Sequence, residues 1–115
     1  MFNQVDYMSF AIEEAVKAKN KKEVPVGAII VDDKGIIIAK AHNLVELNNN
    51  STCHAEKLVI EKALQITGNR FLDKYDLWVT LEPCLMCAGI IKQTRIRRLY
   101  FGVEDKKGGA IVNGP

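Results

Sequence analysis

The most constraining feature of the sequence is a strand–helix–strand run in its second half. Leu77–Leu81 is an apolar, β-branched stretch that Pro83 ends, and Cys84–Gln93 has the length of a short helix. Arg98–Val103 then predicts another strand. Two strands joined in this way form a parallel pair with a right-handed crossover, and the helix packs on one face of their sheet. The run therefore predicts an α/β fold.

The residues before this run predict two further helices and two further strands. Residues 6–19 predict a helix that Asp6 caps. Its expected apolar side and ion pair are Met8, Ile12 and Ala15, and Glu13 with Lys17. Val26–Val31 and Ile36–Ala41 predict a hairpin with a glycine-containing turn, and both strands are apolar enough to be covered on two faces. Residues 53–66 predict a second helix, which Gly68 ends.

The predicted elements follow the order α-β-β-α-β-α-β, and helices must cover both faces of the sheet. We therefore expect a three-layer α/β/α sandwich with a mixed sheet, as a single domain over residues 1–115. A chain of 115 residues has no room for a second domain. Apolar residues make up 48% and charged residues 26%, which excludes disordered and collagen-like chains.

The sequence also bears on location. No apolar run approaches the roughly 20 residues of a membrane span, so no membrane association is expected. The stretch Met1–Phe10 mixes polar and apolar residues, unlike a secretory signal. Three cysteines are an odd number, which argues against a secreted disulfide framework. We expect a cytoplasmic protein, in which closely spaced cysteines usually serve metal or redox chemistry.

Cys84 and Cys87 lie at a predicted helix start, where one turn separates them and the helix dipole favours thiolates. Alone, this pair fits a redox couple as well as half of a metal site. His54 begins another predicted helix, where a single histidine is more often structural. One imidazole and two thiolates together make three zinc ligands and leave one position for water, as in catalytic zinc sites. The neighbouring Cys53 points about 100° away from His54 on a helix and is not expected to bind.

Glu56 follows His54 by two residues. A carboxylate beside a zinc site can take a proton from the activated water and return it to a leaving group. Its alternative role is to stabilise the first turn of the helix. The pattern H-x-E…P-C-x-x-C is the signature of zinc-dependent deaminases, whereas a zinc finger or ribbon needs a second ligand pair. We therefore predict one Zn²⁺ per chain on His54, Cys84 and Cys87, with Glu56 as the catalytic residue.

Several further segments match one family. They are Glu23–Ala28, Ala41–Asn43, His54–Glu56, Thr80–Gly89, Arg95–Ile96, Phe101–Val103 and Asp105–Ala110. Through them the chain resembles the bacterial tRNA-specific adenosine deaminases of the cytidine/deoxycytidylate deaminase superfamily, from about Tyr7 to Ala110. The resemblance implies a cytidine deaminase-like fold and a zinc hydrolase that acts on an amidine C–N bond. The implied reaction converts adenosine to inosine at the wobble position of the tRNA anticodon.

The resemblance also implies roles for individual residues. Asn43 would hydrogen-bond the target base, although a polar residue at a strand end also suits a turn. Val26 and Gly27 would line the base pocket, and a backbone group of Ala55 would help to orient the purine. His42 is expected to lie away from the metal, in a packing or polar contact.

Basic residues gather in the last quarter of the chain. The candidates for contacts with the RNA backbone are Arg95, Arg97, Arg98, Lys106 and Lys107. An ordinary solvated face is the alternative. The expected partners are a tRNA anticodon stem-loop and a second copy of the chain, with Leu85–Ile91 as a candidate homodimer interface. The chain is expected to lack the C-terminal extension of the family, whose helix helps to hold RNA.

Two other functions stay open on the sequence. A deaminase of guanine, cytosine or nucleosides would use the same zinc chemistry. A catalytically silent, zinc-stabilised RNA-binding subunit would need only the fold and the metal. Glu56 argues against the silent subunit, because a purely structural zinc site has no use for that carboxylate.

Overall fold

The structure is a computed structural model that describes residues 5–112. Four strands form one sheet in the spatial order β2-β1-β3-β4. They are β1 (Gly27–Val31), β2 (Ile37–His42), β3 (Asp76–Leu81) and β4 (Arg98–Val103). Strand β1 is antiparallel to both of its neighbours, whereas β3 and β4 are parallel. The sheet is therefore mixed, as the sequence predicts.

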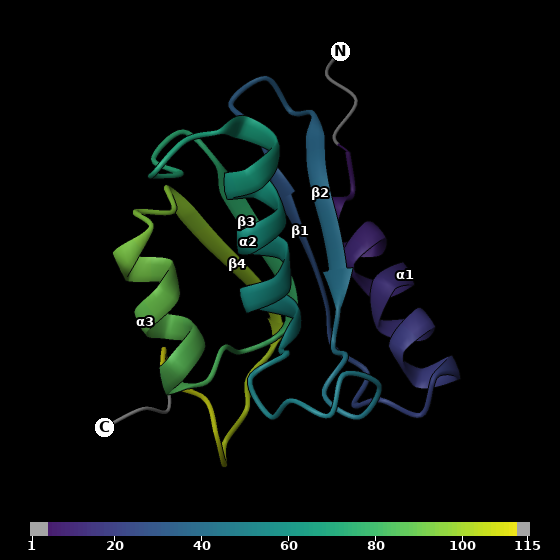
Figure 1. The fold of residues 1–115 in the computed structure, drawn as a ribbon. Helices are drawn as coiled ribbons and strands as arrows, with labels where there is room; N and C mark the ends of the chain where they lie inside the picture. The colour runs from purple at the N-terminus through teal and green to yellow at the C-terminus, as the bar shows by residue number, and fades with distance from the viewer. Residues whose placement is uncertain (1–4, 113–115) are drawn as a thin grey trace.

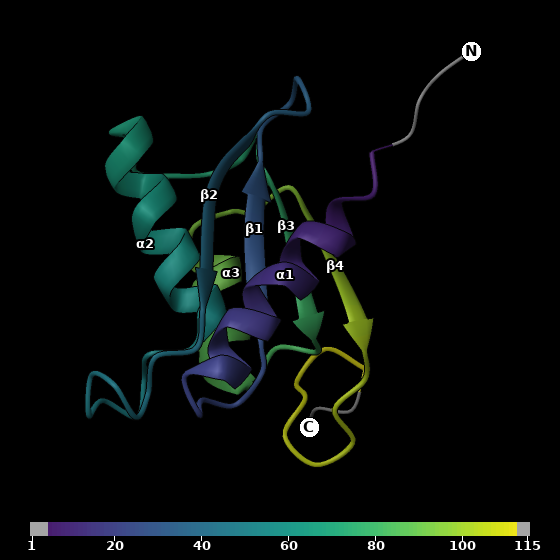
Figure 2. The same ribbon diagram turned by 90° about the vertical axis from the view of Figure 1, so that its right-hand side faces the viewer.

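Three helices cover this sheet. They are α1 (Tyr7–Asn20), α2 (Ala55–Thr67) and α3 (Leu85–Gln93). Helix α1 lies on one face, and α2 and α3 lie on the other (Figures 1 and 2). The predicted three-layer sandwich and its element order are thus confirmed. The expectations about Met1–Gln4 and about the chain end at Pro115 lie outside the described residues.

Side chains alternate between the two faces of the sheet. Ala28 and Ile30 of β1 and Val79 of β3 point toward α2 and α3 and belong to the main apolar core. Residues of the opposite parity face α1, among them Gly27 and its strand partner His42. This alternation decides which residues can reach a site on the α2 side, because a one-residue step along a strand changes the face.

Helix α1 packs through small residues, and the sequence-based prediction of its buried side was partly wrong. Ala11, Ala15 and Ala18 are buried, whereas Ile12 is exposed. The predicted ion pair of Lys17 with Glu13 is also wrong, because the Lys17 ammonium lies 2.7 Å from Glu14 instead. Alanines are the buried apolar residues of α1 because the helix lies close to the sheet, and only small side chains fit between the two backbones.

The ends of three elements meet at one edge of the sandwich. The N-termini of α2 and α3 and the C-terminal end of β3 lie at the bottom of Figure 1. The segment after β4 passes the same edge. Loops and helix ends from distant parts of the sequence therefore surround one place, which is where the chemistry-bearing residues lie. In the part of the chain from residue 5 to residue 112, no helix has the length and apolar character that crossing a bilayer requires.

Candidate metal and catalytic site

Two predicted zinc ligands occupy the N-cap positions of helices. His54 is the N-cap of α2 and Cys84 is the N-cap of α3, and neither side chain hydrogen-bonds to its own helix. An N-cap residue usually satisfies a free N–H group of the first turn. Here the side chains turn toward each other, and the positive ends of both helix dipoles point at the same place, where they favour thiolates.

His54, Cys84 and Cys87 form a compact donor set. The Sγ atoms of Cys84 and Cys87 each lie 3.6 Å from Nδ1 of His54. Zinc bonds of about 2.3 Å to sulfur and 2.0–2.1 Å to nitrogen, in a tetrahedron, separate these atoms by about 3.5 Å. The three donor atoms lie within 4.8 Å of one another, and no fourth His, Cys, Asp or Glu joins them among residues 5–112. The chemistry and the spacing of the donors therefore fit a zinc ion with an open position.

The electrostatics of the cluster also call for a cation. Cys87 is completely buried. Burial raises the pKa of its thiol strongly, and the neighbouring Glu56 carboxylate and Cys84 sulfur raise it further. A metal cation between the sulfurs offsets these effects, because it stabilises the deprotonated ligands.

Glu56 lies beside the ligands in the first turn of α2 and is 4% exposed. Burial raises the pKa of its carboxyl, although backbone hydrogen bonding, His54 and a hydrogen bond with Cys87 partly oppose this shift. A carboxyl with a raised pKa accepts a proton more readily than an ordinary carboxylate does. Glu56 is therefore suited to accept a proton and release it again inside the site.

The donor set lies at a pocket of about 360 Å³. Its walls come from four separate parts of the chain. The lining residues are Lys22, Glu23, Val24, Val26, Asn43, Val45, Glu46, Ser51, His54, Glu56, Leu81, Glu82, Cys84 and Asp105. A pocket of this size, lined by valine and leucine side chains together with many polar groups, suits a small planar ligand such as a nucleobase.

Asn43 lines this pocket and contacts Ala55, which is fully buried and is not among the lining residues. The side-chain Oδ1 of Asn43 accepts a hydrogen bond of 2.7 Å from the backbone N–H of Ala55. Asn43 thus caps α2 from a neighbouring strand end, which frees the side chain of His54 from that task. Oδ1 of Asn43 is thus engaged with α2, and the amide N–H groups of Asn43 can serve as donors to a ligand in the pocket.

Of the two residues expected to line the base pocket, the structure places only Val26 there. Gly27 faces α1 instead, where a Cβ atom would overlap with the backbone of Ala11 and the backbone of Ala15. The expected role of Gly27 therefore needs correction. A glycine at this position lets α1 lie directly against β1, because the next residue after an inward-facing one must face the opposite layer.

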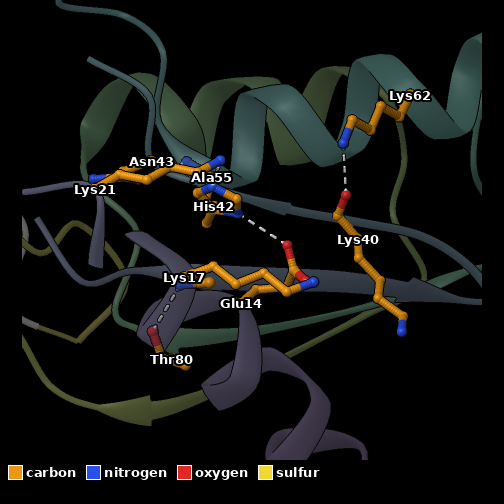
Figure 3. A network of polar contacts seen from close by, with 10 residues as sticks. Glu14, Lys17, Lys21, Lys40, His42, Asn43, Ala55, Lys62 and Thr80 are labelled. Carbon is orange, nitrogen blue, oxygen red and sulfur yellow. Dashed lines mark hydrogen bonds and ion pairs between the residues drawn. The ribbon is translucent and has the colours of Figure 1, made fainter. Parts of the chain in front are cut away.

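His42 lies on the α1 face, away from the donor set, as predicted. Its Nδ1 is 3.0 Å from Glu14 Oε1, and its Nε2 is 3.1 Å from the Lys21 ammonium. Figure 3 shows the contact between His42 of β2 and Glu14 of α1. His42 directly precedes Asn43 in the sequence. The pair links the helix to the strand end that carries Asn43.

Glu14 is buried, and its pKa reflects competing causes. Burial alone raises the pKa of its carboxyl, but hydrogen bonds from His42 and Lys17 lower it below the ordinary value of 4.5. A carboxylate with a lowered pKa stabilises the folded chain above pH 4.5, and this contribution is lost as the pH falls through the lower, folded-state pKa.

We expect Glu14→Gln to destabilise the chain by about 1–3 kcal/mol at pH 7, because it removes a charged partner from His42 and Lys17. The difference from the unmodified chain should shrink as the pH falls below 4.5. Thermal unfolding between pH 3 and pH 7 measures this. The control is Glu13→Gln, at an exposed neighbouring position. Equal effects of the two substitutions at every pH would contradict the assignment.

The five basic candidates for RNA contact fall into two groups. Arg97 donates two hydrogen bonds of 3.0 Å to Asp76, and the guanidinium of Arg95 lies 4.0 Å from the centroid of the Phe71 ring. These residues and the exposed Arg98 lie where β4 begins, about 20 Å along the strand from the pocket. Lys106 and Lys107 are exposed and follow the pocket residue Asp105 directly.

Two buried carboxylates near the pocket were not identified from the sequence. Glu23 accepts hydrogen bonds from the backbone N–H groups of Glu46 and Leu47, at 2.9 and 2.7 Å, and so holds the loop after β2. Glu82 has a similar role toward the segment after β4. For Glu82, an acidic residue between an apolar run and Pro83 is a signal that would have pointed to it, since a carboxylate there must find partners. Glu23 follows a polar stretch and carries no such signal.

Comparisons with known proteins agree with this geometry. Residues 1–103 match the family model of the cytidine and deoxycytidylate deaminase zinc-binding region. Over 103 residues, the chain is 50% identical to the tRNA-specific adenosine deaminase of Bacillus subtilis strain 168. This alignment covers 90% of the chain, which spans 63% of the length of that relative.

Two solved structures share the fold. One comes from studies of A-to-I editing by tRNA:A34 deaminases at the wobble position of transfer RNA, with a TM-score of 0.91 and 47% identity. The match covers 94% of the chain and 82% of that structure. The other is guanine deaminase from Bacillus subtilis, with a TM-score of 0.83, 36% identity, and coverage of 90% and 66%.

Proposed function

The chain belongs to the cytidine and deoxycytidylate deaminase family, and from this premise we propose that it deaminates adenosine to inosine at the wobble position of the tRNA anticodon. The proposal is supported by the similarity to tRNA-specific adenosine deaminases over 90% of the chain. The reaction is a hydrolysis, in which water replaces the exocyclic amine of adenine at C6 and ammonia leaves.

The observation that carries the proposal is the position of Glu56. Its buried carboxyl lies next to His54 and Cys87, inside the pocket. His54, Cys84 and Cys87 would hold one zinc ion per chain, which when bound acts as a Lewis acid and makes water nucleophilic at neutral pH. Glu56 would accept the proton of that water, deliver it to a ring nitrogen of the purine, and assist the departure of ammonia.

The pocket walls would orient the base for this reaction. Asn43 offers amide N–H donors, through which it would bind an acceptor atom of the purine. Val26 and Leu81 supply apolar surface beside the ligands and exclude bulk water. A nucleotide must leave its stack to enter such a pocket, which costs least in a single-stranded loop.

The RNA would lie over the edge of the sandwich that carries the pocket. Lys106 and Lys107 are exposed at this edge and would contact phosphates next to the target nucleotide. Arg95, Arg97 and Arg98 lie at the other end of β4 and would reach only more distant parts of a tRNA. The Arg97 guanidinium is in addition already paired with Asp76.

A homodimer is part of the proposal. Leu85, which follows the ligand Cys84, is 69% exposed on α3, and Met86 and Ile90 are only half-buried. A second copy would cover this apolar surface. Sedimentation equilibrium of the zinc-loaded chain measures the stoichiometry.

The function is tested with an anticodon stem-loop RNA that carries adenosine at the wobble position. We expect zinc-dependent formation of inosine, and its loss on addition of a chelator. Guanine and cytosine serve as competing substrates, with ammonia release as the measurement. Ammonia release from guanine without inosine formation in RNA would identify a guanine deaminase. Zinc binding and RNA binding without any turnover would identify a silent subunit.

A further inference from the structure

Glu82 receives an unusual number of backbone hydrogen bonds from one distant segment. Its Oε1 accepts from the N–H of Asp105 at 3.1 Å, and its Oε2 accepts from the N–H groups of Ile111 and Val112 at 2.9 and 2.7 Å. Glu82 belongs to the short connection between β3 and α3. It precedes Asp105 by 23 residues and Val112 by 30 residues. A single carboxylate thus holds both ends of the segment 105–112.

This arrangement is buried and closely packed. Glu82 is 2% exposed, and these N–H donors contribute to the stabilisation of its buried charge. Gly109 packs directly on the carboxyl group, where a Cβ atom would overlap with Glu82. The backbone N–H of Ala110 also donates a hydrogen bond of 2.9 Å to the carbonyl oxygen of Pro83, next to the ligand Cys84.

The segment contributes one residue to the pocket lining and exposes two lysines directly after it. Asp105 lines the pocket, and its carboxylate accepts hydrogen bonds from the N–H groups of Lys107 and Gly108, at 3.1 and 3.0 Å. Lys106 and Lys107 are exposed at the tip of the loop. The conformation of this loop therefore fixes where one pocket wall and two ammonium groups lie relative to the donor set.

We propose that Glu82 is a positioning residue that holds the segment 105–112 against the pocket and thereby sets the affinity for a polynucleotide substrate. The inference rests on the proposed function, since it concerns RNA binding at the same site. It assigns to Glu82 no contact with the reacting base. Its effect acts through the loop, on the groups that meet nucleotides beside the target.

Glutamine at position 82 is the informative substitution. The carboxylate accepts on both oxygens, whereas an amide accepts only on one and donates on the other. Glutamine can therefore satisfy either the Asp105 N–H or the N–H groups of Ile111 and Val112, but not both sets. One end of the segment should detach while the side-chain volume in the core stays the same.

The first readout is independent of catalysis. In hydrogen–deuterium exchange of zinc-loaded Glu82→Gln, amides of the segment 105–112 should exchange at least tenfold faster than in the unmodified chain. Exchange in α2 and the zinc content should stay unchanged. Unchanged exchange in 105–112 would overturn the inference, and so would loss of zinc together with faster exchange throughout the chain.

The second readout is kinetic. Glu82→Gln should raise KM for the anticodon stem-loop about tenfold, while kcat changes by less than about threefold. Glu104→Gln is the matched control, because it removes the same charge at an exposed position next to the segment. Similar KM values for both variants would show that charge and not loop position governs RNA affinity, and would contradict the inference.

A second variant approaches the same contact from the loop. Gly109→Ala should displace the Glu82 carboxyl and reproduce both the faster exchange and the higher KM. If Gly109→Ala has the same KM as the chain without substitutions, the proposal is contradicted, even if Glu82→Gln does not fold. If the unmodified chain neither binds nor deaminates the stem-loop, the proposed function fails and the RNA role of Glu82 fails with it. The exchange experiment still decides separately whether Glu82 holds the segment.

Discussion

Glu56→Gln is expected to lower kcat on the stem-loop by at least about 10³-fold while zinc stays bound at one ion per chain. Glutamine fills the same space but cannot accept and release a proton, and general acid–base catalysis contributes roughly 10²–10⁴-fold. The carboxyl lies beside the ligands but is not among the three donor atoms, so metal binding should survive. Inosine formation and zinc content per chain are the measurements.

The same substitution, which lowers activity, should raise the thermal stability of the metal-free chain. Burial raises the pKa of Glu56, so in the metal-free chain its charged form destabilises the fold above pH 4.5. Glu56→Gln should therefore unfold at a higher temperature than the unmodified metal-free chain at pH 7, and the difference should vanish at acidic pH. Glu61→Gln, at an exposed position of the same helix, serves as the control for both measurements. A Glu56→Gln enzyme within tenfold of full activity would remove Glu56 from the mechanism.

Cys87→Ala is expected to abolish zinc binding and activity together. Cys87 is completely buried at the core side of the donor set, so no other side chain can replace its sulfur. A ligand at 1,000 times its dissociation constant stabilises the folded state by about 4 kcal/mol. For a domain of this size, each kcal/mol corresponds to roughly 4–8 °C in Tm. The zinc-loaded chain should therefore lose at least about 10 °C in Tm on this substitution.

Cys53→Ala provides the matched control for this prediction. Cys53 is also a buried cysteine and adjoins His54, but it lies outside the donor set and contacts Asn48, with 3.6 Å between its Sγ and Nδ2. We expect this variant to keep one zinc ion per chain and its activity. Elemental analysis and thermal unfolding distinguish the two cases. Loss of zinc in Cys53→Ala, or its retention in Cys87→Ala, would contradict the ligand assignment.

The helices, the strands and the donor set follow from the sequence because their signals are local. Asp6, Gly68 and Pro83 mark element ends, and short spacings place Cys84 and Cys87 on one turn. The strands β3 and β4 were predicted as a parallel pair for the same reason, since one short helix joins them.

The features that the sequence did not reveal depend on residues far apart in the chain. Arg97 pairs with Asp76 only because β3 and β4 lie side by side in one register, which composition cannot indicate. The pocket wall at Asp105 depends on Glu82, 23 residues earlier. Gly27 was assigned to the pocket from the family resemblance, whereas the structure places it against α1, on the opposite face of the sheet. The first two features need the tertiary arrangement of strands and loops, which the order of the elements along the chain leaves undetermined.

The N-cap placement of His54 and Cys84 has a consequence for how the protein matures. His54 belongs to the first half of the chain, with β1 and β2, and the thiolates belong to the second half, 30 residues later. Neither half carries all three donors during synthesis. Binding of one metal ion by all three donors would therefore report that both halves have assembled, and a bound ion would act as a cross-link that closes a long loop and opposes its reopening.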